Sequence, residues 1–170
     1  MKINILAIDQ ARNGAWSVFN NSKKELVGYG TFSFDNKLYS YSKVILHIEE
    51  LILSIIKAYD IKYISIEDIQ LRVNVQAFKK LAQLQGVLVN LCERSKLKYG
   101  LVAPTQWQNF CKDKNKNISH KVEVEHPDKK NSKKLSLQFI KDKFDIDTDN
   151  DNLADAICIG YYTVNNIKIK

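Results

Sequence analysis

The spacing of the hydrophobic residues changes near residue 40, from the short period of β-strands to the longer period of α-helices. Before that point, apolar and aromatic residues form three short runs, at 3–8, 15–19 and 26–34, with brief polar connections. Such runs predict three antiparallel strands joined as a meander. Over residues 41–59 apolar residues recur three and four positions apart, which predicts a helix. A meander followed by a helix indicates a sheet covered by helices.

The remaining elements alternate between these two patterns. The sequence predicts a strand at 61–66, a long helix at 75–97, a brief strand at 101–103, a short helix at 104–110 and final helices at 136–144 and 153–164. The order predicts a mixed five-stranded α/β sheet, with three antiparallel strands and then parallel ones, flanked by helices. This is the ribonuclease-H-like order. Neither an internal repeat nor a second domain is evident, so we expect one domain over residues 1–170.

Acidic residues stand at three places that this topology brings together. Asp9 ends the first predicted strand and Glu67 ends the fourth, and these two strands are expected to be parallel neighbours. Their carboxylates would then meet at one edge of the sheet, since neither charge can enter the core without cost. Asp155 lies in the first turns of the final helix, with Asp151 one turn earlier and Asn152 on the same side. We expect this helix to pack beside the first strand and complete the cluster.

Clustered carboxylates repel one another unless cations are present, and hard divalent ions with oxygen ligands remove that penalty. The expected metal ligands are therefore Asp9, Glu67, Asp151 and Asp155, binding Mg²⁺ or, in its place, Mn²⁺. Two such ions can cut a phosphodiester. A simpler interpretation applies to single residues: Asp149 or Asp151 is expected to cap the last helix, and a lone Glu67 would be an ordinary strand end.

Charge and cysteine usage point to the partner and the setting. The formal net charge of +7 favours a polyanion, and residues 112–134 are rich in lysine, although a solvated loop would look similar. The three cysteines form no metal-site pattern, and Cys92 and Cys158 are expected to be buried free thiols. No apolar run approaches the ~20 residues of a membrane span. We expect a cytoplasmic protein, in the host cytoplasm if a phage encodes it.

Four stretches resemble the RuvC family of Holliday-junction resolvases, particularly its small bacteriophage members. They are Ile-Leu-Ala-Ile-Asp at 5–9, Ile-Ser-Ile-Glu at 64–67, Leu-Ala-Gln-Leu-Gln-Gly-Val at 81–87 and Ala-Asp-Ala-Ile at 154–157. The resemblance spans nearly the whole chain in order. It implies a Mg²⁺-dependent endonuclease of DNA recombination and repair, a homodimer that makes paired nicks in four-way junctions and forks. It also implies that Lys134, or alternatively Lys133, aids the reaction.

The chain departs from the family in three places. Asn152 stands where the family usually has a fourth Asp, so either Asp151 or the amide oxygen of Asn152 would complete the metal site. Gln10 follows the first Asp where bacterial members have Pro. After Glu67, where bacterial members carry an aromatic wedge, this chain has Ile-Gln-Leu-Arg at 69–72. Junction selectivity is therefore less firmly implied than cutting.

The long helix at 75–97 is apolar around more of its girth than one contact requires. A second subunit would cover the extra surface, although a neighbouring helix of the same chain could also do so. Two other functions remain open at this stage. One is ribonuclease-H-type cleavage of RNA–DNA hybrids, and the other is a branched-DNA-binding module with a decayed site, which Asn152 keeps under consideration.

Overall fold

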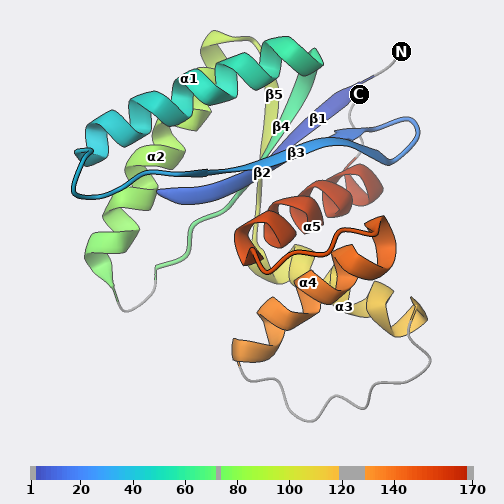
Figure 1. Ribbon diagram of the computed structural model, residues 1–170. Helices are drawn as coiled ribbons and strands as arrows, with labels where there is room; N and C mark the ends of the chain where they lie inside the picture. Colours follow the sequence, from blue (N-terminus) through green and yellow to red (C-terminus); the bar gives the residue numbers. More distant parts are fainter. Residues whose placement is uncertain (1–2, 72–73, 119–128, 168–170) are drawn as a thin grey trace.

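The computed structural model describes residues 3–71, 74–118 and 129–167 (Figure 1). In chain order its elements are β1 (Asn4–Asp9), β2 (Asn13–Asn20), β3 (Glu25–Ser33), α1 (Tyr41–Tyr59), β4 (Ile61–Glu67), α2 (Val75–Arg94), β5 (Lys98–Val102), α3 (Pro104–Ile118), α4 (Lys129–Phe144) and α5 (Asp151–Asn166).

The five strands form one mixed sheet in the order β3-β2-β1-β4-β5. Strands β1, β2 and β3 pair antiparallel, whereas β4 pairs parallel with both β1 and β5. Helices α1 and α2 cover one face, and α3, α4 and α5 cover the other (Figure 1). The predicted fold class is therefore confirmed, including the parallel pairing of β1 with β4.

Strand β1 is buried on both faces because helices cover each side of the sheet. Its side chains alternate, as they must in a strand. Leu6 and Ile8 pack in the core under α1 and α2, whereas Ile5 and Ala7 pack in the core under α5. Asp9 follows Ile8 and therefore belongs to the α5 face.

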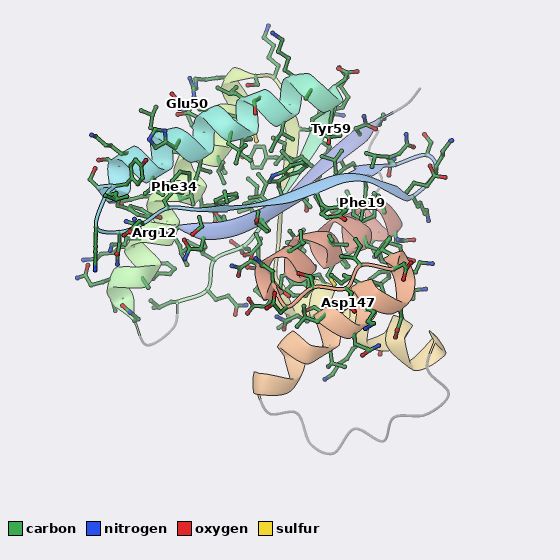
Figure 2. The ribbon with its side chains drawn as sticks, viewed as in Figure 1. Arg12, Phe19, Phe34, Glu50, Tyr59 and Asp147 are labelled. Atoms are coloured by element: carbon green, nitrogen blue, oxygen red, sulfur yellow. The ribbon has the colours of Figure 1, made fainter. Side chains whose placement is uncertain are left out.

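Helix α5 lies close against β1 and β2 because small groups line the contact. A Cβ added to Gly160 would lie 2.6 Å from the Phe19 ring, so only glycine permits this approach. The Ser17 hydroxyl donates a 2.7 Å hydrogen bond to the Ala156 carbonyl, which holds the helix on the strand. Figure 2 shows Phe19 on the side of the sheet that faces α5 and Tyr59 on the opposite side, at the end of α1.

Several predicted boundaries differ from the observed ones. Strand β5 begins at Lys98 rather than 101, because its pairing with β4 supplies hydrogen bonds that its weak apolar pattern does not reveal. Helix α3 continues to Ile118, and α4 already begins at Lys129, although residues 112–134 lack apolar periodicity. The predicted cap of α5 was wrong. Asn150 caps it instead, accepting a 3.0 Å hydrogen bond from the Leu153 backbone N–H.

The cysteines confirm a further expectation. Cys92 and Cys158 are buried and free, as predicted, and Cys111 is too. Burial raises the pKa of the Cys158 thiol well above its usual range, with further contributions from Cys111 and Asp155. Across the described ranges, no helix is both long and apolar enough to cross a bilayer.

Candidate active site

Asp9 and Glu67 are brought side by side by the register of two parallel strands. Ile8 of β1 is paired with Ile66 of β4, so the two acidic residues that follow stand at equivalent positions. Both side chains belong to the α5 face, because Ile8 and Ile66 occupy the opposite core. Asp9 is only 9% exposed. The predicted meeting of these two strand-end carboxylates is what the topology produces.

The β2 strand passes very close to Asp9. A Cβ on Gly14 would lie 2.4 Å from the Asp9 carbonyl oxygen and 2.6 Å from the Phe32 ring. Only a residue without a side chain allows this approach. Gly14 therefore helps to hold the end of β1 against its neighbour, which fixes the backbone that carries Asp9.

The carboxylate of Glu67 is held by a tryptophan. The indole nitrogen Nε1 of Trp107 donates a hydrogen bond of 3.0 Å to Glu67 Oε1. This contact follows from the topology: Glu67 is paired with Val102 at the end of β5, and α3 starts two residues later at Pro104. Proline suits the first position of a helix. Trp107 then lies one turn into α3, above the strand end.

A network of amides ties the same strand ends to α2. Gln10, which is 4% exposed, donates from Nε2 to the Glu67 carbonyl at 2.7 Å and to Gln85 Oε1 at 2.9 Å. Gln85 in turn donates from Nε2 to Asp68 Oδ1 at 3.3 Å and accepts from the Ile69 backbone N–H at 3.3 Å. The network fixes the turn that leaves β4. The Oε1 atom of Gln10 is buried without a hydrogen-bond partner among the described residues.

These strand ends open onto a cleft of about 330 Å³. Its acidic part consists of Asp9, Glu67 and Asp68, and α2 contributes an apolar wall of Ala77, Phe78 and Leu81. The other lining residues are Gln10, Ala11, Ile69, Gln70, Asn74 and Pro104. A larger hollow of about 680 Å³ lies elsewhere, along β3, and contains none of the predicted site residues.

The acidic residues of α5 lie on the same face of the sheet but do not line this cleft. The start of α5 is anchored beside β2, because Asn152 Nδ2 donates a 3.1 Å hydrogen bond to the Asn13 carbonyl. Asp151 occupies the first turn, where a negative charge is favourable. Asp155 lies one turn further along, near enough to Cys158 to influence its pKa. Asn152 therefore has a structural contact at the position where members of the resembled family usually have an Asp.

The chemistry of the site suits a hard divalent cation. Asp9 and Glu67 present oxygen donors on adjacent strands, at a position where two like charges are unfavourable without a cation. In the described part of the chain, however, no three His, Cys, Asp or Glu side chains are grouped closely enough to hold a metal ion together. The structure thus assembles the strand-end pair, while the contribution of α5 stays a prediction.

The structure describes only part of the lysine-rich segment at 112–134. Lys133 and Lys134 fall in α4, but their side chains lie outside the described residues. Of the lysines in residues 112–134, Lys112 and Lys114 have described side chains, both on α3. The Lys114 ammonium lies 5.5 Å from the centre of the Phe110 ring.

Sequence reasoning missed three contributors to the site, namely Trp107, Gln85 in its bridging role, and Asp68 as part of the cleft. Asp68 had a signal, since it directly follows Glu67. Gln85 lies within the stretch at 81–87 that carries part of the family resemblance. Nothing in the sequence indicated that Trp107 would contact Glu67, because a buried Trp in a short helix is ordinarily a core residue.

Comparison with known families gives one match. The family model described as crossover junction endodeoxyribonuclease RuvC matches residues 5–126, which is more than half of the chain. Among curated proteins no match is found.

Solved structures with the same fold accompany that match. RuvC of Thermus thermophilus in complex with a Holliday junction substrate aligns with a TM-score of 0.72 and 10% identity, over 94% of this chain and 92% of that one. The Fowlpox virus resolvase with Holliday junction DNA gives 0.58 and 13%, over 96% and 97%. The yeast mitochondrial Holliday junction resolvase gives 0.61 and 11%, over 96% and 79%. At these identities the likeness shows the fold.

Proposed function

The chain belongs to the RuvC family of crossover junction endodeoxyribonucleases, and on that premise we propose which of its residues cut DNA and how they are arranged. The family makes the chain a Holliday junction resolvase, a DNA endonuclease. It also decides against the alternative of a ribonuclease that cuts RNA–DNA hybrids. We propose that Asp9, Glu67, Asp151 and Asp155 form the catalytic and metal-binding set.

The observation that carries this proposal is the pairing of Asp9 and Glu67 at one strand edge of a single cleft. Members of the family typically use Mg²⁺, and these oxygen donors suit it, with Mn²⁺ as a substitute. Asp9 and Glu67 would hold the cation pair, together with Asp151 and Asp155 from α5. When bound, two such ions supply the charge that activates a water and stabilises the leaving oxygen of the phosphodiester.

The protein's own task is to fix the positions of these carboxylates. Gly14 and the β1–β2 pairing hold the backbone at Asp9. Glu67 is held at its carbonyl by Gln10 and at its carboxylate by Trp107. Such preorganisation matters because a small displacement of a catalytic group costs a large factor in rate. Lys134, or Lys133, is proposed to approach the scissile phosphate from the start of α4.

The proposed substrates are four-way junctions and forks. Two of the solved structures with this fold are complexes with Holliday junction DNA, and the net charge of +7 suits a polyanion. In place of the bacterial wedge, this chain has Ile-Gln-Leu-Arg at 69–72, of which Leu71 is 68% exposed. We propose that the protein opens the junction without an aromatic residue at that point.

We also propose a homodimer built on α2, since a junction with two scissile strands requires two sites on one face. Helix α1 covers part of α2, where the Tyr41 hydroxyl donates a 2.7 Å hydrogen bond to the Lys80 carbonyl. The remaining surface includes Gly86, where an added Cβ would meet no atom of the described residues within 4 Å apart from the backbone of its own helix. A second helix could approach closely there. A single domain of bacteriophage type, active in the host cytoplasm, completes the proposal.

The test is cleavage of labelled four-way junctions, forks, linear duplexes and RNA–DNA hybrids with Mg²⁺, Mn²⁺ or EDTA. We expect paired, metal-dependent nicks in branched DNA. The Asp9→Asn variant should lose at least about 100-fold in rate, since a metal ligand contributes several kcal/mol of transition-state stabilisation, yet should bind junctions normally in EDTA. Junction binding by the wild type without cleavage in either metal would instead identify a binding module with a decayed site.

A further inference from the structure

Trp107 makes a contact that its position in the core does not require. The side chain is 2% exposed and packs in the core under α5, a role that needs only the apolar surface of the ring. Its only polar group, the indole N–H, is directed at Glu67 Oε1 at 3.0 Å. Tryptophan is thus the residue that fills this volume and also brings a hydrogen-bond donor to the strand end.

The chemistry of the indole makes this contact specific. An indole nitrogen donates a hydrogen bond and never accepts one, and it does not titrate in the range where enzymes work. A donor of this kind favours the ionised form of a carboxylate. It also limits the orientations that the carboxylate can adopt, because Oε1 must stay near the fixed nitrogen.

The indole itself is held in place by the local fold. Helix α3 begins at Pro104, and the Gln106 side chain accepts a 2.9 Å hydrogen bond from the Ala103 N–H, which closes the first turn as in a capping box. The Asp68 N–H donates to the Val102 carbonyl at 2.8 Å, which ties the exit of β4 to the end of β5. These hydrogen bonds therefore fix both the exit of β4 and the start of α3, the helix that carries Trp107.

We propose that Trp107 is a positioning residue, which orients the Glu67 carboxylate for the divalent cation and the scissile phosphate. The inference rests on the proposed role of Glu67 in cutting DNA. Groups that hydrogen-bond a metal ligand from behind set its orientation and basicity, and their loss costs about 10- to 100-fold in metal affinity or activity. If Trp107 only fills the core, removing its N–H would leave the metal affinity and the activity unchanged.

The decisive variant replaces Trp107 by 3-benzothienylalanine, which keeps the shape of the indole and replaces its N–H by sulfur. The matched control places the same residue at Trp16, the only other tryptophan. Trp16 packs with the opposite core and lies 5.9 Å from the Tyr59 ring, centre to centre. Trp107→Phe serves as a second variant that lacks both the N–H and part of the volume.

Two readouts separate positioning from packing. The first is the affinity of the DNA-free protein for Mn²⁺, measured by calorimetry. The second is the Mg²⁺ concentration that half-saturates single-turnover cleavage of a four-way junction. We expect the Trp107 analogue to weaken Mn²⁺ binding or raise the half-saturating Mg²⁺ concentration about 10- to 100-fold, and the Trp16 analogue to match the wild type. Junction binding in EDTA should be unchanged in both.

The inference is overturned if the Trp107 analogue and Trp107→Phe change only the melting temperature and leave both metal readouts at wild-type values. Failure of the proposed function looks different, because the wild type itself would then fail to cut junctions in either metal. The two outcomes are distinguished before any variant is compared.

Discussion

Replacing Glu67 should affect both stability and activity, because its carboxylate is also the acceptor of a buried indole N–H. We expect Glu67→Gln and Glu67→Leu to be equally inactive but unequally stable. Both variants lose the charge, but only glutamine retains an oxygen that can accept from Trp107. The leucine variant should unfold with a free energy lower by about 1–3 kcal/mol, measured by urea titration. Equal stabilities would show that the bond contributes nothing to folding.

The thiol of Cys92 makes stability depend on pH in the alkaline range. Burial, and secondly the charge of Glu93, raise the pKa of Cys92 from 9.0 to about 11. The unfolded chain loses this proton near pH 9 and the folded one only near 11, so the stabilisation is complete below 9 and is lost between 9 and 11. The free energy of unfolding should fall by about 1.4 kcal/mol per pH unit there.

The control for this dependence is Cys92→Ala, compared with the wild type by urea unfolding from pH 8 to pH 11. The variant should lose stability less steeply with pH, because one raised thiol has been removed. Parallel curves for the two proteins would contradict an altered pKa at this position.

At the scale of elements, the close contact of α5 with β2 requires a glycine at position 160. A Cβ at Gly160 would lie 2.6 Å from the Phe19 ring and 2.7 Å from the Ser17 hydroxyl. We expect Gly160→Ala to destabilise the fold by about 1–3 kcal/mol through overpacking, although alanine is the better helix former by about 1 kcal/mol. Thermal or urea unfolding measures this change.

The control is Ser54→Ala, on the exposed side of α1, which should change the free energy of unfolding by less than about 0.5 kcal/mol. Since α5 carries Asp151 and Asp155, junction cleavage by Gly160→Ala should also fall. A Gly160→Ala protein that is more stable than the wild type would refute the close packing of this helix.

At the scale of the whole molecule, the proposed dimer can be tested at Gly86. An arginine there has room in the single subunit, because beyond its own helix backbone no described atom lies within 4 Å of the added Cβ. Arginine also suits a helix better than glycine. In a dimer packed on α2 it would bury a charge. We expect Gly86→Arg to sediment as a folded monomer where the wild type sediments as a dimer, and to nick junctions on one strand at a time. A dimeric variant would place the interface elsewhere.

The sequence by itself determined the element order, the sheet topology and the two strand-end carboxylates. These follow from local rules: side-chain period distinguishes strands from helices, and a charged residue after a buried strand must lie at the edge of the sheet. The pairing of Asp9 with Glu67 therefore follows from the sequence alone. The weakly patterned β5 and the polar stretches of α3 and α4 were located poorly, since pairing and packing decide such segments rather than composition.

Only the tertiary structure decided which side chains surround those carboxylates. Trp107 meets Glu67 across 40 residues of chain, and Gln10 meets Gln85 across 75. Neither contact leaves a periodic trace in the sequence, because each depends on the register of β4 against β5 or on how α2 crosses the sheet. The position of α5 is likewise set by packing. Its acidic residues are evident in the sequence, but their distance from the cleft depends on how closely Gly160 lets the helix approach β2. Local chemistry specifies the ligands, and packing specifies their partners.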